Sequence, residues 1–161
     1  MKKGFWEDFE LNKEEYEDAD WWFLDGQNGI EGELDGKGYN LFGFLHGDCS
    51  VFAQYLKGKY NYSVEAVFQG GQLVHMYCVE QASDGRKIYV DVRGKIDDWD
   101  VFIQEFVDDG LLDTTGNLDI RHYSHIPEKY TDQTEGKKAL SFCESADRAY
   151  RYWEPEILRT A

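Results

Sequence analysis

The chain has 161 residues, 42% of them hydrophobic and 16% aromatic, so we expect a single domain over residues 1–161 with an apolar core. Its 17 Lys and Arg face 32 Asp and Glu, and the net charge of −15 disfavours nucleic acid and anionic membranes as direct ligands. Three widely spaced cysteines and the lack of an apolar leader after Met1 predict a reduced, cytoplasmic protein without a disulfide scaffold.

The first 48 residues predict little regular structure. Asn12 followed by Glu15 is typical of the capping box of a short helix over residues 14–18. Between Gly26 and Gly43 there are six glycines among acidic and amide side chains, which predicts a loop or a short irregular hairpin.

A helix is expected to begin at Cys49, with Asp48 as its N-cap. Apolar residues at positions 49, 52, 53 and 56 follow the i, i+3, i+4, i+7 spacing of a helix face on a core, and the helix should stop near Gly58. Three runs rich in β-branched and aromatic residues follow at 62–68, 72–80 and 86–92, separated by short glycine-containing turns. This alternation predicts an antiparallel meander.

The last third of the chain predicts two more helices. Asp97 and Asp98 open an amphipathic segment that should end before Gly110, residues 110–140 carry no clear pattern, and Ser145 can cap a helix over 146–153. We therefore expect an α+β fold, with the helix at Cys49 packed on an antiparallel sheet and additional N- and C-terminal helices.

Cys49, His75 and Asp91 are the candidate catalytic residues. A thiol at a helix N-terminus has a lowered pKa, because unpaired backbone N–H groups and the helix dipole favour the thiolate. An imidazole from the second strand can exchange a proton with that thiol, and a carboxylate from the third can orient the imidazole. Strand alternation places His75 on the opposite face from Cys78, although the strand register does not follow from the sequence.

Gly47–Leu56 resembles the nucleophile helix of papain-like cysteine enzymes of the transglutaminase-like and NlpC-type families. His75–Val79 resembles their histidine strand and Tyr89–Asp91 their aspartate strand, so the similarity covers roughly residues 45–94. The resemblance implies a helix packed on an antiparallel sheet, no cofactor, and hydrolysis, deamidation or transamidation of an amide in a protein or peptide.

The oxyanion hole departs from the papain pattern. No Gln lies shortly before Cys49. The backbone N–H of Cys49, together with His46 or Asn40, would then have to bind the oxyanion.

Structural roles and metal binding are the alternatives for these side chains. Cys49 lies on an apolar helix stripe and can be a core thiol, His75 can be a sheet-face histidine, and Asp91 can pair with Arg93. Two His-x-x-Cys pairs, His46/Cys49 and His75/Cys78, suggest zinc. Residues 74–79 contain no turn former, however, so an extended strand would splay the second pair apart, and we expect no metal site.

A second class of function follows from the acidic residues, which cluster at 14–20 and again at 97–113. A small acidic protein can occupy the nucleic-acid cleft of a basic protein, as phage anti-CRISPR and antirestriction inhibitors do, or neutralise a basic bacterial toxin as an immunity protein. The expected partner is then a basic protein, and binding should not depend on Cys49.

Overall fold

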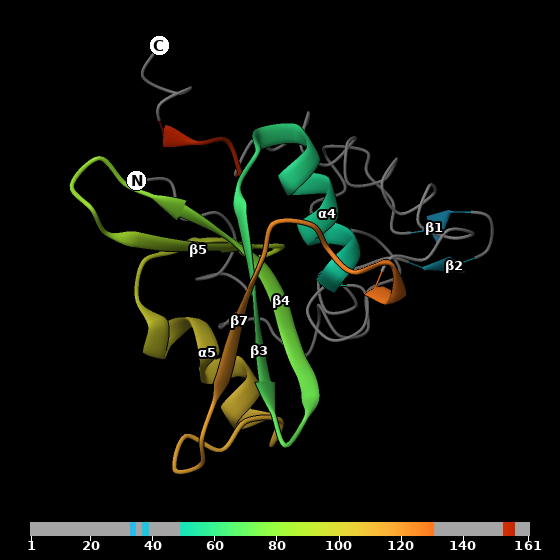
Figure 1. The fold of residues 1–161 in the computed structure, drawn as a ribbon, viewed down its shortest axis with the longest axis vertical. Helices are drawn as coiled ribbons and strands as arrows, with labels where there is room; N and C mark the ends of the chain where they lie inside the picture. Colours follow the sequence, from blue (N-terminus) through green and yellow to red (C-terminus); the bar gives the residue numbers. More distant parts are fainter. Residues whose placement is uncertain (1–32, 35–36, 39–48, 131–152, 157–161) are drawn as a thin grey trace.

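The computed structural model describes residues 33–34, 37–38, 49–130 and 153–156. Their centre is a five-stranded antiparallel sheet in the order β6-β5-β4-β3-β7 (Figure 1). The strands are β3 (Ser63–Gln69), β4 (Gln72–Gln81), β5 (Lys87–Asp91), β6 (Gly94–Ile96) and β7 (Asp119–Tyr123). A separate pair, β1 (Glu33–Leu34) and β2 (Lys37–Gly38), forms a two-stranded antiparallel sheet.

Two helices cover opposite faces of the sheet, α4 (Cys49–Tyr60) and α5 (Trp99–Asp108) (Figure 1). On one face, the Cys78 thiol donates a hydrogen bond to the Ala53 carbonyl of α4 at 3.4 Å. Tyr77, the preceding residue of β4, points to the other face, where its ring centroid lies 4.9 Å from that of Phe102 in α5. The described fold is therefore α+β, as predicted, with β4 between the two helices.

The predicted meander of β3, β4 and β5 is confirmed. Gly70 and Gly71 form the two-residue turn between β3 and β4, with φ of 61° and 78°. A two-residue hairpin of this kind needs positive φ at both central positions, which glycine adopts without steric cost.

The helix boundaries follow local capping. The Asp98 side chain accepts a hydrogen bond from the backbone N–H of Val101 at 3.1 Å, so it is the N-cap of α5, as the sequence indicates. The helix at Cys49 was expected to stop near Gly58, and α4 ends two residues later, at Tyr60. Asn61, with φ of 58°, then turns the chain toward β3, because asparagine tolerates the left-handed conformation.

The sequence patterns missed β6, β7 and a short 3-10 helix, η2 (Glu128–Tyr130). Buried Glu65 of β3 joins β7 to the sheet, since its carboxylate lies 3.2 Å from the His122 ring and accepts a hydrogen bond from the Tyr77 hydroxyl at 3.0 Å. Burial and the Glu65 charge raise the pKa of Tyr77 far above its usual value, so Tyr77 remains a neutral donor.

The additional helix expected over residues 14–18 lies outside the described residues, as does the proposed N-cap Asp48. Of the helix expected over 146–153, only Trp153 is described, and it lies in a bend and not in a helix. Trp153 is described and is fully buried, with its ring 5.1 Å from that of Phe52 in α4. In the described part of the chain, every helix is too short or too polar to cross a membrane.

Candidate active site

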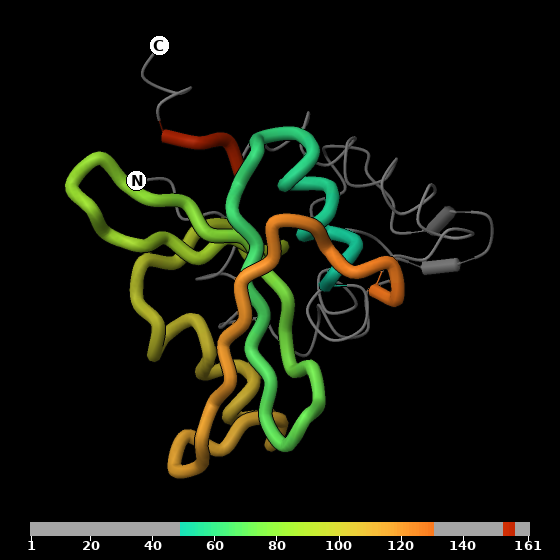
Figure 2. The backbone as a smooth tube through the Cα atoms, viewed as in Figure 1, coloured from blue at the N-terminus to red at the C-terminus, as the bar shows by residue number. Residues whose placement is uncertain are grey.

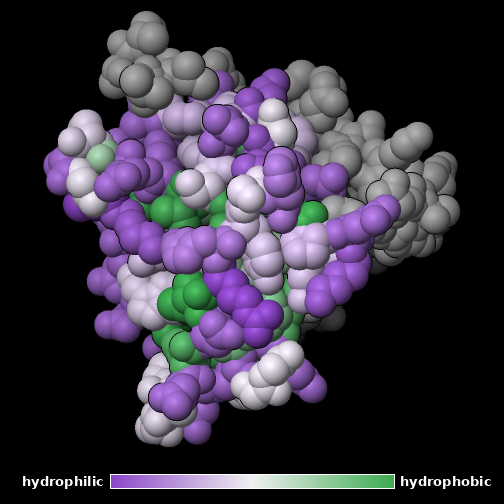
Figure 3. All heavy atoms as spheres, in the orientation of Figure 1, coloured by the Kyte–Doolittle hydropathy of each residue, from purple (hydrophilic) through white to green (hydrophobic). Residues whose placement is uncertain are grey.

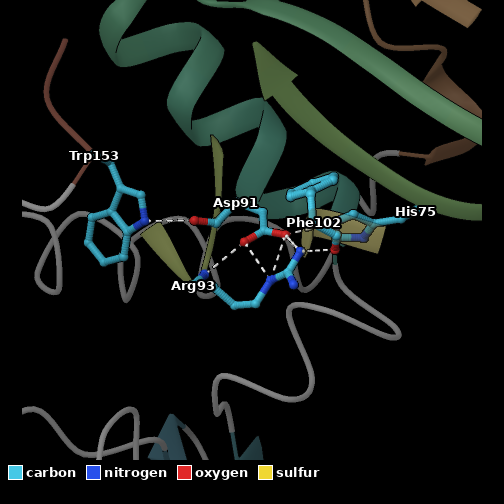
Figure 4. Close-up of polar contacts among 5 residues, drawn as sticks. All are labelled: His75, Asp91, Arg93, Phe102 and Trp153. Atoms are coloured by element: carbon cyan, nitrogen blue, oxygen red, sulfur yellow. Dashed lines mark hydrogen bonds and ion pairs between the residues drawn. The ribbon is translucent and has the colours of Figure 1, made fainter. Parts of the chain in front are cut away.

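The structure brings His75 and Asp91 together, as the strand order suggested (Figure 4). The distance between His75 Nε2 and Asp91 Oδ2 is 2.9 Å, and the two side chains are only 0% and 3% exposed. The register explains the contact: Cys78 of β4 pairs with Val90 of β5, so Asp91 comes one step later on the face that His75 shares.

Arg93 completes a buried polar cluster on the same face. Its backbone N–H donates to Asp91 Oδ1 at 2.9 Å, and its Nη2 donates to Asp91 Oδ2 at 2.8 Å and to the Phe102 carbonyl at 3.0 Å. The guanidinium carbon also lies 4.7 Å from the centroid of the Phe102 ring. The alternative reading in which Asp91 pairs with Arg93 is therefore confirmed, alongside the contact with His75.

The electrostatics of the cluster keep Asp91 ionised. Burial alone would raise the pKa of Asp91, but the Arg93 charge and the hydrogen bond from His75 bring that pKa well below its usual value. A carboxylate has no proton to give, so His75 must carry the proton on Nε2 and donate it to Asp91. The tautomer of the imidazole is thereby fixed.

Aromatic packing holds the His75 ring in one orientation. The ring centroids of Phe106, Phe102 and Tyr77 lie 4.5, 5.7 and 5.8 Å from that of His75. All three side chains are fully buried. A ring confined in this way has little freedom to rotate, so the polar contact with Asp91 and the aromatic contacts with α5 position it together.

Cys49 is the first residue of α4 and is 8% exposed. The first turn of α4 itself contains no acidic side chain, while Asp48, which precedes Cys49 in the sequence, lies outside the described residues. Cys78 differs sharply: it is 0% exposed, and burial raises the pKa of its thiol far above the ordinary value. Both described cysteines are buried, and Cys49 belongs to the apolar core, as the alternative of a core thiol expects; Cys143 lies outside the described residues.

The structure joins two of the three predicted catalytic residues. No hydrogen bond within the described structure links the Cys49 thiol to the His75 ring, which lies on the face covered by α5. The pairing between β4 and β5 ends at Cys78 and Val90, so no residue of β5 pairs with His75. The His75 side chain is nevertheless fully buried, because α5 covers it on the face of the sheet opposite α4.

The remaining site predictions fall on two groups of residues. His46 and Asn40, the expected oxyanion donors, lie outside the described residues. His75 and Cys78 point to opposite faces of β4 and cannot share a metal ion. Within the described ranges, no group of three or more His, Cys, Asp or Glu side chains is arranged to hold a metal.

Two other buried contacts near the cluster were not predicted. Trp153 donates its indole N–H to the Asp91 carbonyl at 2.8 Å, from 62 positions away in the chain (Figure 4). On the α4 face of the sheet, Lys95 of β6 pairs with Glu80 of β4 at 2.6 Å. The sequence analysis named Arg93 as a partner of Asp91, but it read both on one strand, whereas Arg93 lies in the turn between β5 and β6; the sequence contained no signal for the Trp153 contact.

Comparison with known proteins gives no match, whether with a protein family, a curated protein or a solved structure.

Proposed function

We propose that the protein is a cysteine-dependent enzyme that hydrolyses, deamidates or transamidates an amide of a protein or peptide. Cys49 is the nucleophile, His75 the general acid and base, and Asp91 the residue that orients the imidazole. The hydrogen bond between His75 Nε2 and Asp91 Oδ2, at 2.9 Å, supports this proposal more than any other observation. In the same proposal, α4 and the sheet correspond to the helix and sheet of a papain-like core.

The chemistry assigns a role to each ring nitrogen. Asp91 holds Nε2, so proton exchange with the thiol takes place at Nδ1. The Cys49 thiolate adds to the amide carbonyl carbon, His75 then protonates the leaving nitrogen, and the C–N bond breaks to give a thioester. Water or an amine attacks the thioester and releases the thiolate, with His75 taking up the proton of the attacking group.

The His75 ring is buried on the face of the sheet opposite α4, so the proposal requires a reactive state in which the start of α4 reaches His75 Nδ1 past the end of β5. The backbone N–H of Cys49 would then bind the oxyanion, with His46 or Asn40 as the second donor. Arg93 keeps Asp91 ionised, but because Asp91 is paired with Arg93 its carboxylate stabilises a His75 imidazolium less. The N-terminus of α4 therefore has to supply part of the stabilisation of the Cys49 thiolate.

Alkylation with limiting iodoacetamide across a pH series, followed by mass mapping of each cysteine, tests this proposal. In the wild-type protein, we expect Cys49 to react at a rate that persists below neutral pH, because an imidazolium stabilises the thiolate. The variant His75→Gln should lose this reactivity in the acid range. His122→Gln is the matched control, since that side chain is 71% exposed on β7.

The result that contradicts the proposal is an ordinary thiol titration at Cys49 in the wild-type protein. An acid-range rate that is unchanged in folded His75→Gln would contradict it equally. Circular dichroism of both variants verifies that the comparison is made between folded proteins.

Binding of a basic protein is a second candidate function, supported by the exposed carboxylates around α5. Six exposed carboxylates lie on α5 or beside it: Asp97, Asp98, Asp100, Asp108, Asp109 and Asp113. Most of the described surface seen in Figure 3 is hydrophilic. Capture by an immobilised basic nuclease separates the two functions. If the protein acts by binding alone, the nuclease should capture wild type and Cys49→Ala equally. It should capture Asp100→Asn/Asp108→Asn more weakly, and high salt should weaken capture of all three proteins.

A further inference from the structure

A pocket of about 570 Å³ lies at the end of α4 opposite Cys49. Three separate parts of the chain form it: the turn from α4 into β3, the end of β4 with the turn after it, and the segment Pro155–Glu156. Figure 2 shows this C-terminal segment beside the start of β3. The volume is within the usual range of small-molecule and side-chain binding sites, roughly 300–1,000 Å³.

Hydrogen bonds fix the C-terminal wall of the pocket. The Tyr62 hydroxyl donates to the backbone carbonyl of Trp153, and the backbone N–H of Glu156 donates to Glu80 Oε1 at 2.8 Å. Trp153 and Tyr62 are both buried, so the segment is anchored on one side by packing and on the other by Glu80. The pocket is thus a built feature of the fold.

The chemistry of the walls favours a cation. Tyr60 and Tyr62 contribute two rings with centroids 5.7 Å apart, and Glu80 and Glu156 contribute carboxylates. Among the described residues that line the pocket, none is a lysine, arginine or histidine. Lys95 lies behind Glu80 and neutralises it, with Nζ–Oε distances of 2.6 and 3.1 Å. Glu156 interacts electrostatically with the exposed Arg86, which does not line the pocket, and supplies most of the charge that a ligand meets. A ring face and a carboxylate together suit an ammonium or guanidinium group.

We infer that this pocket binds the cationic side chain of a peptide, the ammonium of lysine or the guanidinium of arginine. Cys49 and Tyr60 are the two ends of α4, a separation of about 16 Å at 1.5 Å per residue. An extended peptide spans that distance with roughly five residues. The pocket would then select a basic residue several positions from the reacting amide; this selection role rests on the proposed function, whereas cation binding itself does not.

Titration of full-length Cys49→Ala protein with capped tripeptides tests the inference. The probes are acetyl-Ala-Lys-Ala-amide, its arginine counterpart and its norleucine counterpart, which has a similar chain without the charge; binding is followed by NMR. We expect the lysine or arginine peptide to bind at least roughly fivefold more tightly than the norleucine peptide. Glu156→Gln should remove most of that difference. Asp119→Asn, which removes one exposed charge on β7, should leave it unchanged.

Equal affinity for the charged and norleucine peptides, or full retention of the preference in Glu156→Gln, overturns the inference. These outcomes are separate from those of the alkylation experiment. If the protein prefers cationic peptides but Cys49 is not activated, the pocket is a cation site without a role in catalysis. If Cys49 is activated but the protein shows no cation preference, the enzyme is supported and this pocket is rejected as the recognition site of the enzyme.

Discussion

Asp91→Asn should destabilise the protein strongly. The substitution keeps the shape of the side chain but removes the charge that faces Arg93, whose side chain is only 1% exposed. An ion pair this deeply buried typically costs about 3–5 kcal/mol when one partner is removed, because the other charge stays out of water without compensation. Such a loss is a large part of the roughly 5–15 kcal/mol that stabilises an ordinary domain.

The chain contains a matched control for this substitution. Asp119 and Arg121 of β7 have the same i, i+2 spacing and an Nε–Oδ2 distance of 2.8 Å, but their side chains are 57% and 46% exposed. Asp119→Asn should therefore change stability by less than about 0.5 kcal/mol. Urea unfolding of the three proteins gives both values, and a loss in Asp91→Asn no larger than that in Asp119→Asn would refute the assigned role of the buried charge.

The pH dependence gives a second reading of the same cluster. The pKa of Asp91 is lower in the folded protein than in the unfolded chain. The ionised Asp91 therefore contributes its full stabilisation of the fold at pH values above its unfolded pKa of about 3.9, and this stabilisation is lost as the pH falls further. The difference in unfolding free energy between wild type and Asp91→Asn should thus be largest near neutral pH and shrink in acid. A difference that grows on acidification contradicts this sign.

Four further predictions concern stability and are checked by urea unfolding. Lys95→Met should cost about 3 kcal/mol, because it leaves the Glu80 carboxylate without its buried partner. Tyr62→Phe should cost about 1–2 kcal/mol through loss of the buried hydrogen bond to Trp153, and no loss would contradict the anchoring of that segment. Gly58→Ala should stabilise the protein by about 0.5–1 kcal/mol, since a Cβ there meets no atom within 4 Å. Gly85→Ala should destabilise it by about 1–2 kcal/mol, because its φ is +89°.

The sequence predicted those parts of the fold that have strong local signals. The three meander strands have β-branched and aromatic residues between glycine turns, and α4 and α5 have apolar stripes. Two strands escaped prediction for physical reasons. β6 has only three residues, and β7 carries polar, mostly exposed side chains whose place depends on pairing with β3 and on Glu65.

The candidate site was predictable in its members but not in its geometry. Strand alternation gave the faces of His75 and Asp91, whereas their contact required the register set by the turn after β4. Two hydrogen bonds close that turn, from the Ala82 N–H to the Arg86 carbonyl and from the Gly85 N–H to the Ala82 carbonyl, both at 2.9 Å. The placement of Cys49 relative to the His75 ring depends on how the start of α4 packs near the end of β5. Long-range packing of this kind leaves no pattern in the sequence.

The Glu80–Lys95 pair links the stability of the sheet to the proposed cation pocket. Replacing a buried ion pair by apolar residues of similar size is often neutral or stabilising, so Glu80→Leu/Lys95→Met should recover most of the loss expected for Lys95→Met alone. The double variant nevertheless removes the oxygen that accepts the N–H of Glu156, and with it one anchor of the pocket wall. We therefore expect a folded protein, of near wild-type stability by urea unfolding, that has lost its preference for the lysine tripeptide. Retention of that preference would show that Glu80 stabilises the sheet without positioning Glu156.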